Sequence, residues 1–100
     1  MTDKFTLDAA GNPKPESDPI KRAAWFEKAD RRVARTEIGG VTISTVFLSL
    51  DHSFCGGPPI LWETLVMGGK LDQEQDRCAG SREQDEAMHI RMVLRVKANL

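Results

Sequence analysis

Two runs of alternating residues flank a glycine pair in the stretch Val33-Ala-Arg-Thr-Glu-Ile-Gly-Gly-Val-Thr-Ile-Ser-Thr-Val46. A Gly-Gly pair suits a two-residue primed turn, which needs positive φ at its central positions. Pairing across that turn puts Ile38 opposite Val41 and places Ile43 and Phe47 on the same face of the two strands. The other face is polar near the turn. The stretch therefore predicts an antiparallel hairpin with one buried face.

A helix is expected before this hairpin. Asp18 can cap free backbone N–H groups, and Pro19 is tolerated at a first helical position. The helix is predicted over residues 19–30, with Trp25 and Phe26 toward the core.

Two strands and a second helix are expected after the hairpin. An apolar run over residues 60–67 lies between proline and glycine pairs and predicts a central strand, and residues 74–79 predict a polar edge strand. Ser81 and Gln84 form a capping box, which opens a helix from residue 82 to about residue 98. This helix has two apolar stripes, of which one is expected to dock on the sheet. The other packs against the first helix or is offered to a partner; the stripes are Ala87, Ile90, Val93 and Leu94, and Met88, Met92 and Val96.

The order of these elements predicts an α+β fold: an antiparallel sheet of three to four strands with two helices packed on one face. The 100 residues suffice for one domain. We expect residues 1–17 to form an N-terminal arm and residues 18–100 the domain. The arm is either a mobile tail or a segment that pins Phe5 and Leu7 onto the core.

Composition restricts the function classes. The net charge of −1 argues against a dedicated nucleic-acid binder, which would usually be basic. Two cysteines make no disulfide framework, and the chain has neither an apolar run long enough to span a membrane nor the segments of a signal peptide. We expect a cytosolic protein, as a monomer or a dimer.

Few residues are suited to catalysis or metal binding. His52, Cys55, Cys78 and His89 supply the ligand types of a zinc site, but only the first two have tight spacing. A Cys–His nucleophile would also need an orienting group, and Asp51 is too close in sequence to converge on it. No hydrolase, metalloprotease or nucleotide-binding motif is present. We expect no enzyme activity, no cofactor and no metal.

Charged residues are unevenly distributed. Six acids lie between residues 72 and 86, and six bases between residues 21 and 35. Such runs are either solvated faces or binding surfaces. Asp51 and His52, before a loop that ends in two prolines, either anchor that loop or lie at the rim of a binding surface. The candidate partner-binding residues are Arg31, Arg32, Arg35, Asp51, His52, Asp72, Glu74 and Asp76.

Four blocks of the chain, residues 4–13, 25–34, 43–54 and 57–69, carry a resemblance. They include the run Ser-Thr-Val-Phe-Leu, then Leu-Asp-His, Gly-Pro-Pro and Glu-Thr. The chain resembles a widespread family of small proteins encoded by tailed phages, prophages and other mobile elements. It departs from the family's pattern at Cys55, and at Cys78, where an aromatic residue is common.

The resemblance implies a role in interaction with a bacterial host. It is compatible with an anti-CRISPR protein in the host cytoplasm, which would bind an effector complex and block its nucleic-acid channel. The expected partner is thus a host defence complex, and the acidic segment would compete there with a phosphate backbone. The alternative is a nucleic-acid-associated phage accessory protein that uses Arg31, Arg32 and Arg35, although direct nucleic-acid binding is not the favoured expectation.

Overall fold

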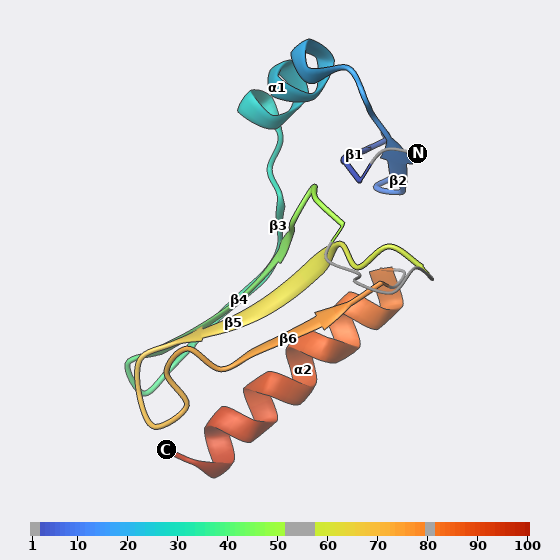
Figure 1. Ribbon diagram of the computed structural model, residues 1–100. Helices are drawn as coiled ribbons and strands as arrows, with labels where there is room; N and C mark the ends of the chain where they lie inside the picture. Colours follow the sequence, from blue (N-terminus) through green and yellow to red (C-terminus); the bar gives the residue numbers. More distant parts are fainter. Residues whose placement is uncertain (1–2, 52–57, 80–81) are drawn as a thin grey trace.

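The computed structural model describes residues 3–51, 58–79 and 82–100 (Figure 1). In it, two strands and a helix are followed by four strands and a second helix. The elements in chain order are β1 (Phe5–Leu7), β2 (Pro13–Pro15), α1 (Pro19–Lys28), β3 (Arg32–Ile38), β4 (Val41–Phe47), β5 (Trp62–Met67), β6 (Gln75–Cys78) and α2 (Arg82–Ala98).

The glycine pair forms the turn between β3 and β4, as the sequence predicted. Gly39 and Gly40 have φ values of 54° and 80°, a region that costs other residues energy. Ile38 pairs with Val41, and the antiparallel register continues to the pair of Ala34 and Thr45, beyond which it shifts by one residue before Arg32. Every second residue of β4, beginning at Val41, is buried. The local turn chemistry and the alternation of the strand therefore agree with the observed pairing.

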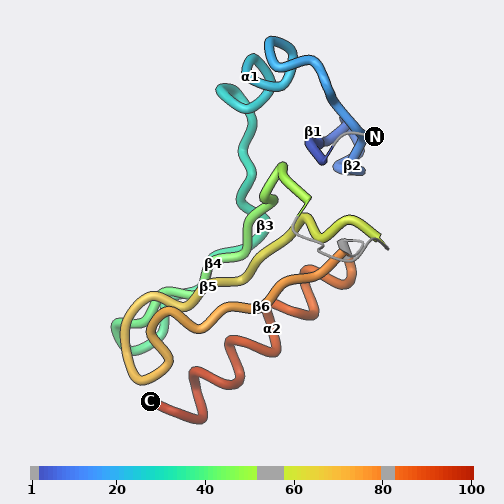
Figure 2. The backbone as a smooth tube through the Cα atoms, in the orientation of Figure 1, coloured from blue at the N-terminus to red at the C-terminus, as the bar shows by residue number. Residues whose placement is uncertain are grey.

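The main sheet has the strand order β3-β4-β5-β6, and each pair of neighbours is antiparallel. The α+β class and the four-stranded sheet are as predicted, with β5 in the interior and polar β6 at an edge. The sheet twists along its length (Figure 1). The arm hairpin and the end of α2 lie at opposite ends of an elongated molecule of 44 × 31 × 21 Å (Figure 2).

Helix α2 lies across one face of the sheet and contacts all four of its strands. The docked stripe is Met88, Met92 and Val96, each no more than 3% exposed. The second stripe points away from the sheet, with Ile90 and Leu94 both 58% exposed. Of the two outcomes expected for that stripe, packing against the first helix is not found.

Helix α1 differs from the expectation that both helices cover one face. It lies beyond the end of the sheet (Figure 1), beside β1, and none of its residues is fully buried. Its start is as predicted, because the Asp18 carboxylate accepts hydrogen bonds from two backbone N–H groups of the first turn. Trp25 connects the helix to the core through an edge-to-face contact with Phe47, whereas Phe26 is 38% exposed.

The N-terminal arm is attached to the core. Phe5 is buried in a cluster with Phe47, Leu61, Trp62 and Met88, and Leu7 packs against that cluster. Strand β1 pairs with β2, although β2 begins and ends with proline. Proline is compatible with an edge strand, where some N–H groups face solvent.

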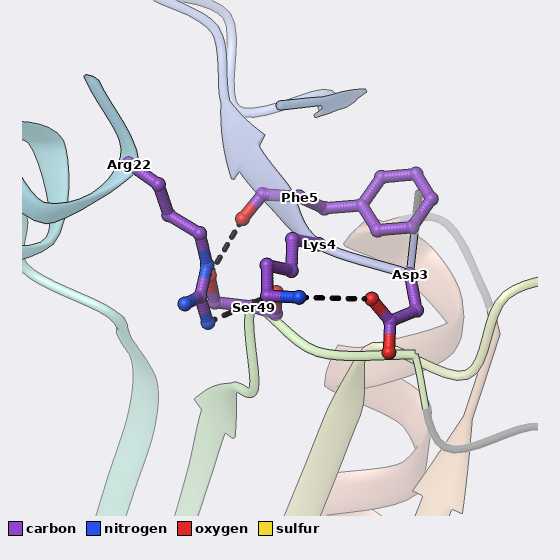
Figure 3. Close-up of polar contacts among 5 residues, drawn as sticks. All are labelled: Asp3, Lys4, Phe5, Arg22 and Ser49. Carbon is purple, nitrogen blue, oxygen red and sulfur yellow. Dashed lines mark hydrogen bonds and ion pairs between the residues drawn. The ribbon is translucent and has the colours of Figure 1, made fainter. Parts of the chain in front are cut away.

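Hydrogen bonds around Ser49 hold the arm, α1 and the end of β4 together (Figure 3). The Ser49 hydroxyl donates to the Phe5 carbonyl at 2.6 Å and accepts from Nε of Arg22 at 3.1 Å. The Phe5 N–H donates to the Ser49 carbonyl at 3.0 Å. Ser49 is fully buried at a φ of 65°, so these bonds also hold an unfavourable backbone conformation.

We predict that Phe5→Ala lowers the free energy of unfolding by about 3 kcal/mol, because it removes a large side chain from a closed apolar cluster. Chemical denaturation measures the change. Ile20→Ala is the control: Ile20 is 79% exposed on α1, and its loss should change stability by less than about 0.5 kcal/mol. Equal, small effects of both substitutions would contradict the assignment of the arm to the core.

Candidate functional site: the two edges of the sheet

The predicted basic and acidic residues lie at opposite edges of the four-stranded sheet. Arg32 and Arg35 belong to β3, and Asp76 belongs to β6. Glu74 directly precedes β6, and Asp72 lies in the turn before it. Three strand spacings separate the two edges, or roughly 14 Å. The structure therefore does not bring the two charged sets together.

The basic edge consists of Arg32 and Arg35, because Arg31 is used by the fold. The Arg31 guanidinium lies 4.0 Å from the ring centroid of Phe26, and its Nη1 donates to the Phe47 carbonyl at 3.2 Å. These contacts join α1 to the end of β4. Arg32 is exposed at the start of β3. Of the three predicted arginines, Arg31 is thus a structural residue.

Arg35 is exposed and pairs with Glu37 at 2.7 Å on the same strand. Both side chains are about half exposed, at 47% and 61%. An ion pair in such a position contributes little to stability, because water solvates both ions well. Arg35 can therefore exchange Glu37 for another anion at low cost.

The acidic edge consists of Asp72, Glu74 and Asp76, all of them exposed. Asp72 accepts a hydrogen bond from the Gly68 N–H at 2.7 Å, which closes the turn between β5 and β6. Glu74 lies 3.9 Å from Arg95 of α2, a long contact between two exposed groups. The Asp76 carboxylate accepts from the backbone N–H of Arg77. Asp72 therefore has a local structural role, whereas Glu74 and Asp76 face solvent.

The sheet face opposite α2, here called the open face, connects the two edges. Cross-strand pairs place Arg32, Val46, Glu63 and Arg77 in one row, and Arg35, Ser44, Leu65 and Gln75 in the next. Glu63 pairs with Arg77 at 2.8 Å and is 16% exposed. Val46 and Leu48 are half-buried, and Leu50 is 37% exposed.

Asp51 anchors the loop that follows β4. Its carboxylate accepts from the Ile60 N–H at 2.9 Å, and its own N–H donates to the Asp3 carbonyl at 2.7 Å. These bonds agree with the anchoring role that the sequence left open. His52 and Cys55 lie outside the described residues.

A buried polar bridge joins α2 to the sheet through His89. Its Nε2 bonds to the Thr36 hydroxyl at 2.8 Å, and its Nδ1 to the Thr45 hydroxyl at 2.7 Å. Thr45 also bonds to Thr64 of β5. Burial lowers the pKa of His89 below its usual value, since the charged imidazolium is poorly solvated there. In the sequence, this bridge is indicated by Thr45, a polar residue at a core-facing position of β4 that needs a buried hydrogen-bond partner.

A cleft of about 420 Å³ lies between the arm hairpin, the start of β3 and α2. Its lining includes Arg31, Arg32, Trp62 and Asp85. The volume is in the range of small-molecule sites, but charges of both signs meet in it and Arg31 is already bound to Phe26 and Phe47. The cleft therefore does not select a class of ligand.

The described part of the chain holds neither a cluster of metal ligands nor a helix suited to a membrane. No three side chains of His, Cys, Asp and Glu gather there in a way that could hold a metal ion. Cys78 is half-buried and packs against the core. Within residues 3–51, 58–79 and 82–100, neither helix has the length and apolar character needed to cross a bilayer.

Comparison with protein-family models, with curated proteins and with solved structures finds no match to this chain.

We predict that the protein loses stability as the pH falls below 6.5, the usual pKa of histidine. The unfolded chain takes up a proton at His89 near that pH, whereas the folded chain resists it until its lowered pKa is reached. The contribution of His89 is thus complete above pH 6.5 and decreases below it. Denaturant titrations at a series of pH values measure the change.

The test variant is His89→Gln, and the control is Ile20→Ala at an exposed position of α1. The first should flatten the dependence of stability on pH in this range, and the second should leave it in place. A His89→Gln protein with the full pH dependence of the unsubstituted chain would contradict the assignment.

Proposed function

We propose that this chain is a non-enzymatic protein-binding module that uses the acidic edge of its sheet, at β6 and the turn before it. The observation that carries the proposal is the separation of charge across a sheet that α2 covers on one face. Glu74 and Asp76 are exposed at one edge, and Arg32 and Arg35 at the other. Edge strands also present backbone groups to which a partner strand can add.

We further propose, on the resemblance to small phage and prophage proteins, that the partner is a host CRISPR effector complex. Nucleic-acid channels of such complexes are lined with Lys and Arg, which bind phosphates. A row of exposed carboxylates has the charge to occupy those side chains in place of a phosphate backbone. The protein would then inhibit immunity by occlusion, without chemistry.

Affinity capture from a bacterial host, followed by mass spectrometry, tests the proposal. The unsubstituted protein is compared as bait with two variants. One carries Glu74→Lys, and the matched control carries Glu27→Lys, the same change at an exposed position of α1. We expect Glu74→Lys to weaken partner binding by about tenfold or more, because it places like charges together at the contact. The control should bind as the unsubstituted protein does.

Two results would count against this function. Recovery of the bait alone would contradict the protein-binding role, and a captured partner without nucleic-acid-guided activity would contradict the CRISPR assignment. Where an effector is recovered, the unsubstituted protein should inhibit its cleavage of target DNA. The Glu74→Lys protein should leave that cleavage largely uninhibited.

A second candidate function, association with nucleic acid, is favoured by the exposure of Arg32 and Arg35 on one strand. Affinity for labelled DNA and RNA should then fall steeply with salt and drop further in the Arg32→Ala, Arg35→Ala double variant. Binding that is absent at low salt would remove this candidate.

A further inference from the structure

The outer side of α2 carries an apolar stripe made of Ala87, Ile90 and Leu94. Ile90 and Leu94 are each 58% exposed, and Ala87 is exposed as well. The spacing of three and then four residues puts these side chains in one line along the helix. It is the spacing of positions that pack between two helices in a coiled coil.

The stripe faces away from the rest of the domain. The opposite side of α2, through Met88, Met92 and Val96, is already buried against the sheet. Helix α1 lies at the far end of the molecule (Figure 1) and makes no contact with α2. In the part of the chain that the structure describes, no other element packs over Ile90 and Leu94.

The charges beside the stripe indicate its occupant. Glu86 and Lys97 are separated by about three helical turns, so both lie on the same flank of the stripe. In a second copy of α2 that runs antiparallel, with Ile90 of one copy against Leu94 of the other, each Glu86 faces the partner copy's Lys97. A parallel copy would instead bring this flank against the partner's opposite flank, which carries Arg91 and offers no acidic residue beside Lys97.

We propose that α2 is a self-association surface, on which two copies of this chain pack their Ala87, Ile90 and Leu94 stripes antiparallel. The contact is isologous, with two equivalent Glu86–Lys97 pairs related by a two-fold axis. Antiparallel helices also place opposite ends of their dipoles side by side. The apolar stripe covers about two turns of α2, and the Glu86–Lys97 pairs extend the contact to about three.

This dimer leaves the open face of the sheet accessible, because α2 and the sheet itself lie between that face and the contact. Two copies would then present two partner-binding surfaces. Linked surfaces of this kind strengthen binding to a partner with repeated sites, without any new contact.

Sedimentation velocity over a concentration series tests the association. The unsubstituted protein should shift from monomer to dimer as concentration rises, and Ile90→Glu should remain a monomer at every concentration. Ile20→Glu, at an exposed position of α1, is the control and should dimerise normally. Circular dichroism checks that each variant is folded. A monomer at all concentrations, or a dimer that tolerates Ile90→Glu, would overturn the proposal.

Charge variants test the orientation of the two helices. Glu86→Lys and Lys97→Glu should each weaken the dimer by about tenfold, and the double exchange should restore it. In a parallel pair the double exchange would have no restoring effect. Arg91 lies on the other flank near the two-fold axis, where it faces Arg91 of the second copy. The two like charges repel each other, so Arg91→Ala should strengthen the dimer.

Zero-length coupling of carboxylates to amines gives a direct readout on the unsubstituted protein. Within one helix, Glu86 and Lys97 are about 16 Å apart, which is too far for a bond without a spacer. The dimer band should therefore contain a Glu86–Lys97 link that the monomer band lacks. A dimer band linked only elsewhere would contradict the antiparallel contact.

Discussion

The side chain of Phe47 connects the two ends of the molecule. Its ring is fully buried and lies edge-to-face on Trp25 of α1 and tilted against Trp62 of β5. Its backbone N–H donates to the Arg31 carbonyl, and its carbonyl accepts from the Arg31 guanidinium. The arm reaches the same cluster through Phe5. Without this contact, α1 and the arm would have little apolar surface against which to pack.

Local chemistry explains what the sequence predicted correctly. A glycine pair between alternating runs specifies both the turn and the register of the β3–β4 hairpin, because a shift of one residue would bury the polar face. The bounds of α2 follow from its helical period and the charges at its ends. The proline and glycine pairs on either side of residues 60–67 likewise delimit the segment that contains β5. None of these inferences needed contacts between residues distant in the sequence.

The placement of α1 and the choice of the docked stripe could not be predicted in this way. Both stripes of α2 are apolar, and period alone does not distinguish them. His89 shares the inner side with Met88 and Met92, and the threonines of the sheet supply partners for both of its ring nitrogens. A buried imidazole needs hydrogen-bond partners, and only the docked side of α2 offers them to His89. The side chain of Ile90 needs none and can remain on the outer side. The charged edges were visible as runs in the sequence, but their separation depends on strand order, which is a tertiary property.

The architecture divides the surface into regions with different physical properties. A sheet covered on one face by a single helix has an open face, and here its side chains combine apolar residues with paired charges such as Glu63 and Arg77. The outer side of that helix is apolar at its centre and oppositely charged toward its two ends. Because the docked stripe of α2 fixes both regions relative to each other, an interaction on one does not require the other to move. The self-association and the partner binding that we propose are therefore compatible on a chain of this size.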